Sequence, residues 1–461
     1  MSSAAMFQRF IEKAPVTVMV RSTLERVLAP AALDAIFAEA AVRQVESELL
    51  FSSVVELLAL VVWRQRDSIN QAYQHAREDF EVSVRSVYNK LNGTETQVCR
   101  ALVRQTAKPL LEIVTALKPR RKPQLAGYRT RIIDGNHLTS TDHRLKVLRH
   151  TWSGPLPGQV LAVLDPDRML IVDLFPCADG EAQERRILPE VIPSAGAREL
   201  WIGDRNFCTT GFLFGLARQG ACFVIRQHKS TLQWDEETKA EKIGRCETGV
   251  IYEQKLLLQE GEQTLWVRRV TIRLDQPTRS GETEIHLLTN LPRKHANAYK
   301  VAELYLKRWT IENAFQEIEQ ALRSEINTLG YPGAALLGFA IAVLTYNALS
   351  VAKWAIEIEH DDAITREQLS GYYLASAVSA DYGGMMIALP EPAWTRRFGK
   401  LTARQFATHL RTCARHVRLD TFRKNVRSPK RPRPKRSSGA IHHHVSTAQL
   451  IADHKMTASQ G

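Results

Sequence analysis

Short apolar runs separated by turn residues dominate the middle of the chain. Ile132 and Ile133 have the character of a buried strand, and two stretches with helical spacing lie at about 181–192 and 209–219. The other strand-like runs are GQVLAVLD (158–165), MLIVDLF (169–175), ELWIG (199–203) and ACFVIR (221–226). The pattern predicts the order strand, strand, strand, helix, strand, helix, strand.

This order suits an α/β fold with a ribonuclease H-like mixed sheet, in which an antiparallel meander continues into parallel strands reached through helical crossovers. Asp134 and Asp204 each follow an apolar run directly. If the fourth strand lies beside the first, the two aspartates meet at the centre of the sheet. A carboxylate at the end of a buried strand costs desolvation free energy unless a cation or several donors compensate it, so the pair suggests a metal site.

The regions on either side have different patterns. Apolar periodicity predicts helices over most of 1–125 and again beyond about 360. Between 228 and 296, alternation and turn residues predict an antiparallel β insertion. The stretch 333–351 carries no charge and is just long enough to span a bilayer, but we expect a helix buried against the sheet.

A third acid lies in YLKRWTIENAF. At 3.6 residues per turn, Tyr305, Arg308 and Glu312 form one row on a helix. A carboxylate suits a hard cation, and a guanidinium suits a phosphate. The alternative is an ordinary charged helix face. Together with the two aspartates, the row predicts three carboxylates around two Mg²⁺ ions, for which Mn²⁺ can substitute.

These motifs resemble the DDE transposases of bacterial insertion sequences, specifically the insertion sequence 4 group with its Tyr-x2-Arg-x3-Glu-x6-Lys signature. The matching positions are Asp134, Asp204, Tyr305, Arg308 and Glu312. Arg226 resembles the arginine that ends the strand after the second aspartate. The resemblance extends over about residues 1–430.

The resemblance implies an organisation for the chain. Residues 1–125 would be a helical DNA-binding region with candidate phosphate contacts at 83–90, although a polar solvated helix face explains those contact residues almost as well. Residues 126–227 and 297–360 would form the two parts of the catalytic domain around the insertion at 228–296. Residues 361–461 would be a helical C-terminal region with a basic disordered tail.

Two positions depart from the family pattern. The signature lysine is replaced by Glu319, for which Arg323 could substitute because it lies four residues further along the same face. Ile285 stands where some relatives have a tryptophan that stacks on a flipped base. Trp266 is the candidate for that contact, although a tryptophan in an alternating strand is more often part of the core.

Charge is concentrated near the C-terminal end. The chain has a formal net charge of +13. From Arg411 to Arg436 there are eleven Lys or Arg and one acid, Asp420, which gives +10 and leaves +3 for the rest. This excess predicts a nucleic-acid-binding arm; the alternative is a solvated tail. Six scattered cysteines indicate reduced thiols in a cytoplasmic protein, associated with the nucleoid when bound to DNA.

The resemblance thus implies a transposase that binds the inverted repeats of its element and cuts and joins double-stranded DNA, both element ends and target. A homodimer would hold the two ends together. Asp134, Asp204 and Glu312 would bind the metal ions, and Tyr305, Arg308, Arg226, Arg323 and Trp266 would contact DNA. The alternatives are an inactive DNA-binding regulator on a transposase scaffold and a related nuclease.

Overall fold

The structure, a computed structural model, describes residues 2–44, 48–139, 141, 145–149, 156–228, 232–278, 281–361, 363–425 and 446–459. Its α-helices before the sheet are α1 (Ser3–Lys13), α2 (Pro15–Val27), α3 (Pro30–Ala40), α4 (Phe51–Val62), α5 (Ile69–His75), α6 (Val84–Gly93) and α7 (Thr96–Leu117). Those within the sheet region are α8 (Leu188–Val191), α9 (Thr210–Arg218), α10 (Ala298–Leu306) and α11 (Trp309–Ala321). Those that follow are α12 (Pro332–Glu359), α13 (Gly371–Ala388), α14 (Glu391–Phe398), α15 (Ala403–Ala414), α16 (Leu419–Phe422) and α17 (Thr447–Ser459).

The strands form one mixed sheet. They are β1 (Arg129–His137), β2 (Gln159–Asp165), β3 (Leu170–Cys177), β4 (Glu199–Gly203), β5 (Cys222–Arg226), β6 (Trp234–Glu237), β7 (Glu241–Cys246), β8 (Gly249–Glu260), β9 (Gln263–Leu274) and β10 (Glu284–Thr289). Their order is β3-β2-β1-β4-β5-β10-β9-β8-β6, with β7 paired to β8. Strand β4 lies parallel to both β1 and β5, and the other pairings are antiparallel. The predicted ribonuclease H-like mixed sheet is confirmed.

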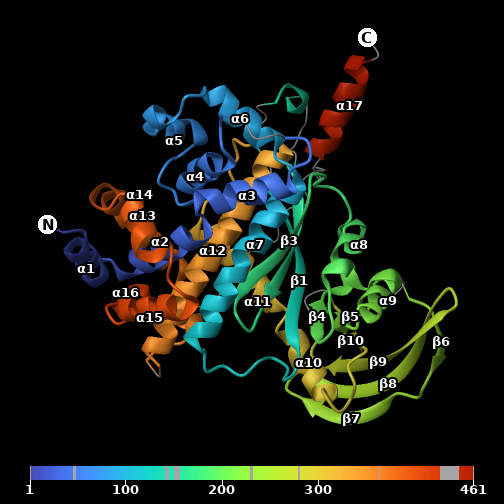
Figure 1. Cartoon of the computed structure of the whole chain (residues 1–461). Coiled ribbons are helices and arrows are strands. Elements are labelled where there is room, and N and C mark those ends of the chain that lie inside the picture. The colour runs from blue at the N-terminus through green and yellow to red at the C-terminus, as the bar shows by residue number, and fades with distance from the viewer. Residues whose placement is uncertain are drawn as a thin grey trace.

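The insertion continues this sheet. Strand β10 pairs with β5 on one side and β9 on the other, so strands β6 to β9 extend the edge of the mixed sheet (Figure 1). Strands β8 and β9 are paired along their whole length, from Gly249 opposite Leu274 to Glu260 opposite Gln263. The long hairpin projects away from the helical part of the molecule.

Alternate residues of each strand face two different cores. Ile132, Ile202 and Val224 belong to the core shared with α7, α10, α11 and α12. Ile133, Trp201 and Ile225 face the core shared with α8 and α9. Because side chains alternate between the faces of a strand, Asp134, Asp204 and Arg226 point to the face that α10 and α11 cover.

The helical stretch predicted at about 181–192 is shorter in the structure. It consists of a 3₁₀ turn at Glu184–Arg186, the single turn of α8, and another 3₁₀ turn at Ile192–Ser194. Pro189 and Pro193 lack the amide hydrogen that a longer helix requires, which explains the short turns.

Helix α12 is the centre of the helical part. It packs against α2, α4, α7 and α15 as well as β3 (Figure 1). By length and composition it could cross a membrane, but its most apolar 18-residue window is entirely buried inside the protein. The uncharged stretch at 333–351 is therefore a buried core helix, as predicted.

The basic C-terminal region lies only partly within the described residues. Arg411 and Arg415 belong to the end of α15 and its cap, and both pair with Glu359 of α12 at 2.9 and 2.7 Å. Part of the charge assigned to a DNA-binding arm is therefore used within the protein. The stretch predicted to be disordered, SPKRPRPKRSSG (428–439), lies outside the described residues.

Candidate functional site

Register brings the two aspartates side by side. Ile132 of β1 pairs with Ile202 of β4, and Asp134 and Asp204 each lie two residues further along. Gly203 of β4 pairs with Ile225 of β5, so Arg226 reaches the same level. Adjacent strands lie about 4.8 Å apart. Asp134, Asp204 and Arg226 therefore form a row across three neighbouring strands, on the face covered by α10 and α11.

The second row lies above the first, on two helices instead of the single helix that the sequence predicts. Tyr305 belongs to α10, and Glu312 belongs to α11. Between them, the amides of Lys307 and Arg308 donate to carbonyls three residues earlier, which makes a tight 3₁₀-like turn. Because Arg308 keeps helical dihedral angles (φ −52°, ψ −37°), the three side chains still lie close together.

Arg308 connects the two rows. Its guanidinium donates to Asp134 at 2.9 Å and contacts Glu312 at 2.7 Å. The side chain of Arg308 is only 8% exposed, compared with 29% for Glu312. The Nε of Arg308 is also buried and has no hydrogen-bond partner among the described residues. The Nε–H of this arginine is thus a donor for which an anionic oxygen would be the acceptor.

The carboxylates affect one another electrostatically. The pKa of Asp134 is raised to about 6, chiefly by burial and also by Glu312 and Asp204, while Arg308 and the amide of Gly135 act to lower it. Burial also raises the pKa of Tyr305, which Arg308 and Arg226 lower. The phenol therefore stays neutral and can donate a hydrogen bond, and the three acids lie within electrostatic reach of each other.

The donor set suits a hard divalent cation. Carboxylate oxygens are the ligands that Mg²⁺ prefers, and three acids with two arginines, Arg308 and Arg226, leave an excess of negative charge. As the side chains lie, however, no three His, Cys, Asp or Glu residues within the described ranges are grouped closely enough to hold one ion. Arg308 stands between Asp134 and Glu312. The residues fit a metal by chemistry, and Arg308 would have to move for both carboxylates to bind one ion.

Two residues that the sequence analysis did not single out, Glu184 and Trp309, lie next to the site. Glu184 accepts a hydrogen bond from Asn206 at 3.2 Å and lies against Gly135, where an added methyl group would stand 1.9 Å from its oxygen. Trp309 is 56% exposed, and its ring centre lies 5.0 Å from the guanidinium of Arg308. The aromatic residue directly after Arg308 was the available signal for Trp309; Glu184 had none.

Arg323 does not lie on the helix face where the sequence placed it. Helix α11 ends at Ala321, and Leu322 is extended. Arg323 donates to the carbonyls of Arg66 and Asp67 and pairs with the Asp67 carboxylate at 3.1 Å. The prediction of a shared face with Glu319 is wrong, because α11 ends two residues before Arg323, which contacts the loop after α4 instead. Glu319 itself is exposed.

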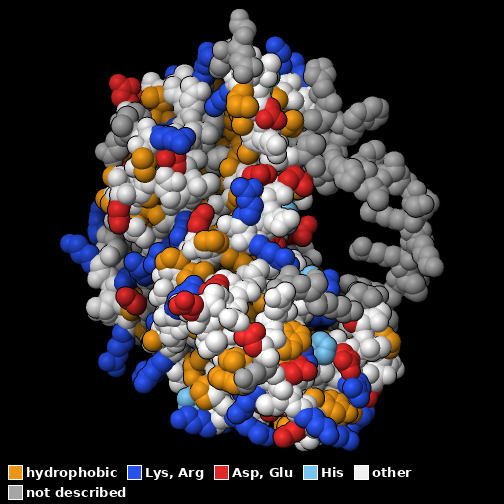
Figure 2. All heavy atoms as spheres, turned by 90° about the vertical axis from the view of Figure 1, so that its right-hand side faces the viewer, with side chains coloured by type: hydrophobic (Ala, Val, Ile, Leu, Met, Phe, Trp, Pro, Cys, Tyr) orange, Lys and Arg blue, Asp and Glu red, His pale blue; other side chains and the backbone are white. Residues whose placement is uncertain are grey.

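Trp266 lies apart from the carboxylates. Val270 of β9 aligns, through Leu287, with Arg226. Trp266 is four residues before Val270, about 13 Å along the strand, and β9 is three strands from β4, about 14 Å across. Its side chain is 50% exposed, so the core alternative is wrong. Figure 2 shows Lys and Arg side chains along the lower rim of the molecule, over the insertion that carries Trp266.

A mixed sheet with two acids level on adjacent strands, Asp134 inside β1 and Asp204 directly after β4, beneath a helix that carries a third acid, suits phosphoryl transfer with divalent ions. Residues 126–348 match the family model of the transposase DDE domain. This segment includes every strand described above and both helices that cover the site. Such domains cut and transfer DNA and generally use divalent metal ions, so the match supports transposase activity in general terms. No curated protein matches the chain.

Proposed function

We propose that this chain is a DDE transposase of the insertion sequence 4 group, which binds the inverted repeats of its element and moves it by cutting and joining DNA. The observation that carries the proposal is the register of β1, β4 and β5. It puts Asp134 and Asp204 level on adjacent strands, with Arg226 beside them. Glu312, above them on α11, completes the set.

The side chains divide into two groups by chemistry. Asp134, Asp204 and Glu312 would hold Mg²⁺, or Mn²⁺ in its place. When bound, the ions supply activation of a water nucleophile and stabilisation of the leaving oxygen. Arg226 and Tyr305 lie at one end of the row, where a guanidinium and a neutral phenol can both donate to a phosphate oxygen.

Arg308 has a double role in this proposal. In the free protein it balances two of the three acids, Asp134 and Glu312. With Mg²⁺ held by the carboxylates, the guanidinium of Arg308, whose Nε is unpartnered, would be able to donate to a DNA phosphate. Arg308 would then orient the phosphate beside the carboxylates, and the freed 3′ hydroxyl of the DNA would be the nucleophile for joining.

A magnesium-dependent cleavage assay on the ends of the element tests the proposal. The substrate is a labelled duplex that contains the inverted repeats found on either side of the reading frame. We expect single-strand cuts at the repeat boundary and, with target DNA present, joined 3′ ends. Asp134→Asn, Asp204→Asn and Glu312→Gln should each reduce cleavage at least about a thousandfold, because each removes a charged ligand.

The matched control is Glu181→Gln, which removes one exposed acid from the loop before Glu184. It should cut at the wild-type rate, and all four variants should bind the repeat with similar affinity in Ca²⁺, which tolerates looser coordination than Mg²⁺. Near-normal cleavage by any one of the three site variants would refute the metal-binding assignment. Gel filtration with bound repeats should give a complex of two chains, because two ends must be held together.

One observation favours a second candidate, a DNA-binding regulator that does not cut. Glu319 is exposed where the family signature has a lysine, and it adds negative charge near the proposed DNA path. Repeat binding without any cleavage in Mg²⁺ or Mn²⁺ would favour this regulator. Cleavage without joined products would indicate a nuclease of the same fold.

A further inference from the structure

A turn beside the site presents a fourth acid. Strands β9 and β10 are joined by residues 275–283, and within this turn the amide of Thr278 donates to the carbonyl of Glu282 at 2.9 Å. The amide of Glu282 donates to the Thr278 hydroxyl at 3.1 Å, and the amide of Gly281 donates to the Thr278 carbonyl at 2.9 Å. Gly281 has a φ of +81°, which favours glycine. The backbone therefore fixes the position of Glu282.

The carboxylate of Glu282 lies between two arginines of the site. One oxygen is 2.5 Å from the guanidinium of Arg226, and the other is 3.5 Å from that of Arg205. Arg226 and Glu282 are 18% and 17% exposed, whereas Arg205 is 49% exposed. Arg205 directly follows Asp204, and Arg226 is level with it. One anion is thus held by two guanidinium groups next to the candidate carboxylates.

We infer that Glu282 is an internal substitute for a DNA phosphate. In the free protein its carboxylate occupies the anion-binding position of Arg205 and Arg226, and a phosphate near the cleavage position displaces it. Guanidinium groups pair with carboxylates and phosphates in the same geometry, so the exchange preserves the pairing of both arginines. This inference rests on the proposed function, because it requires a DNA backbone at this site.

The exchange has a consequence for specificity. A duplex that contacts the protein only through a phosphate at this position gains little binding free energy, since the phosphate must first displace Glu282 from Arg226. A repeat end that also contacts other parts of the protein gains enough to displace Glu282. An acid that opposes binding in this way weakens wrong partners more than the right one.

The test compares Glu282→Gln with Glu260→Gln in duplex-binding titrations. Glu260 pairs with Arg218 at 3.0 Å, at the far end of the β8–β9 hairpin, and so serves as a matched acid–arginine pair. Titrations in Ca²⁺, without cleavage, use a random-sequence duplex at several salt concentrations. We expect Glu282→Gln to bind about threefold to tenfold more tightly than wild type, with log Kd more dependent on salt by about one phosphate contact.

A second variant ties the gain to the arginines. Glu282→Gln combined with Arg226→Ala should lose the gain, because the released guanidinium is then absent. The inference is overturned if Glu282→Gln binds no more tightly than wild type, if Glu260→Gln shows the same gain, or if the gain persists without Arg226. Thermal melting of each variant confirms that it is folded.

The two proposals fail in different ways. A wild-type protein that cuts its repeat ends, with Glu282→Gln unchanged in binding, refutes only the role of Glu282. A wild-type protein that binds no duplex at all refutes both, because no phosphate would then displace the carboxylate.

Discussion

Two groups of charged side chains contrast sharply in this molecule. Of the three candidate metal-binding acids of the site, Asp134 and Glu312 form ion pairs with one arginine, Arg308. The second group, termed the α12 network, has three acids and three cations around helix α12. Its members are Arg121, Glu317, Lys353, Glu357, Arg366 and Glu367. With Glu282, Arg205 and Arg226 included, the site has four acids and three arginines, a surplus of one negative charge, whereas the six members of the α12 network balance.

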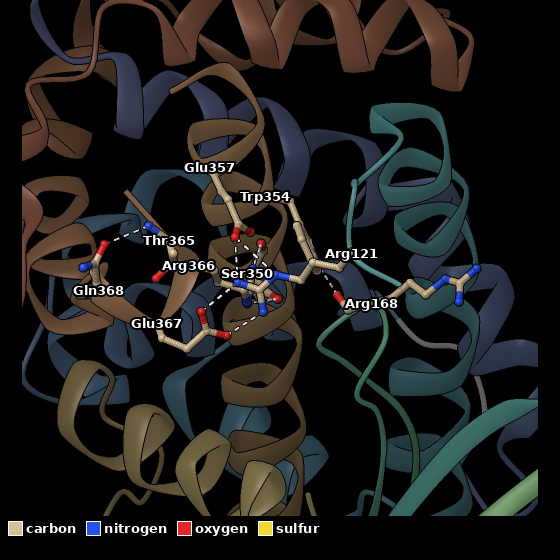
Figure 3. Close-up of polar contacts among 9 residues, drawn as sticks. All are labelled: Arg121, Arg168, Ser350, Trp354, Glu357, Thr365, Arg366, Glu367 and Gln368. Atoms are coloured by element: carbon tan, nitrogen blue, oxygen red, sulfur yellow. Dashed lines mark hydrogen bonds and ion pairs between the residues drawn. The ribbon is translucent and has the colours of Figure 1, made fainter. Parts of the chain in front are cut away.

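The α12 network is satisfied within the protein. Arg366 donates to the carbonyl of Ser350 at 2.7 Å and to its hydroxyl at 2.5 Å. The guanidinium groups of Arg121 and Arg366 lie 5.4 and 5.1 Å from the ring of Trp354, whose indole N–H donates to the carbonyl of Arg168 (Figure 3). Balanced charge and aromatic contacts connect the C-terminal helices and the segment before β1 to helix α12. The excess negative charge of the site instead favours the binding of a cation.

The largest expected effect on stability comes from removing one charge of the α12 network, that of Lys353. Lys353 is 2% exposed and pairs with Glu317; burial lowers the pKa of Lys353 to about 8, and Glu317 raises it. Lys353→Met would leave the Glu317 charge buried without its partner. We expect the free energy of unfolding, measured by urea denaturation at pH 7.5, to fall by about 3–5 kcal/mol.

A double variant separates charge from packing. Lys353→Met with Glu317→Leu replaces the pair by apolar side chains of similar volume, which often restores stability. We expect most of the loss to be recovered. If the single change cost less than about 1 kcal/mol, Glu317 would not need its partner, and the contrast between the two groups would not hold.

Removing a charge from the site should raise the free energy of unfolding, whereas removing one from the α12 network should lower it. The pKa of Asp134 is raised from 3.8 to about 6, so the folded state holds this proton more tightly than the unfolded state. The stabilisation is complete below about pH 4 and is lost as the pH rises through about 6. At pH 7.5 the ionised carboxylate therefore costs up to about 3 kcal/mol, a ceiling because water and salt screen part of the charge.

Asp134→Asn removes that cost while it abolishes the proposed cleavage. We expect the variant to unfold with about 1–2 kcal/mol more free energy than wild type at pH 7.5 and with almost no difference at pH 4.5. Urea denaturation at both pH values measures this. A loss of stability at pH 7.5 would mean that the Arg308 contact outweighs the burial of Asp134, contrary to the comparison.

The sequence predicted the sheet and the two aspartates well, because both depend on local signals. An acid that directly follows an apolar run marked the end of β4 at Asp204 correctly, whereas β1 continues past Asp134 to His137; the element order restricted the topology. Alternation could also show that 228–296 contains strands. It could not show which edge they would join, since pairing is set by contacts far apart in sequence.

The failures have the same origin. The turn at Lys307–Arg308 divides a continuous helical pattern, and helix α11 ends two residues before Arg323, which contacts the loop after α4. Neither contact has a local signature. Trp266 was judged by its own strand alone, and the alternation along that strand does not show which of its side chains other elements cover. Glu282 could be recognised only once register placed Arg226 beside it.

The smallest expected change in stability is at the exposed edge of the α12 network, at Arg121. Arg121 pairs with Glu357 and Glu367 at 2.6 Å each, and its hydrogen bond lowers the pKa of Glu367 to about 2. The Glu367 side chain is 62% exposed, so solvent screens most of this stabilisation. We expect Arg121→Ala to lower the free energy of unfolding at pH 7.5 by about 1 kcal/mol or less, and by less still in 0.5 M NaCl. Since the pKa of Glu367 is lowered, the contribution is present above about pH 4.5 and disappears as the pH falls toward 2.

Arg120→Ala, which removes an 83% exposed partner of Asp361 from the neighbouring position, is the matched control and should change stability by even less. Equal losses from the two variants would mean that Arg121 contributes only as a surface charge, and the balance of the α12 network would then reside in Lys353 and Arg366.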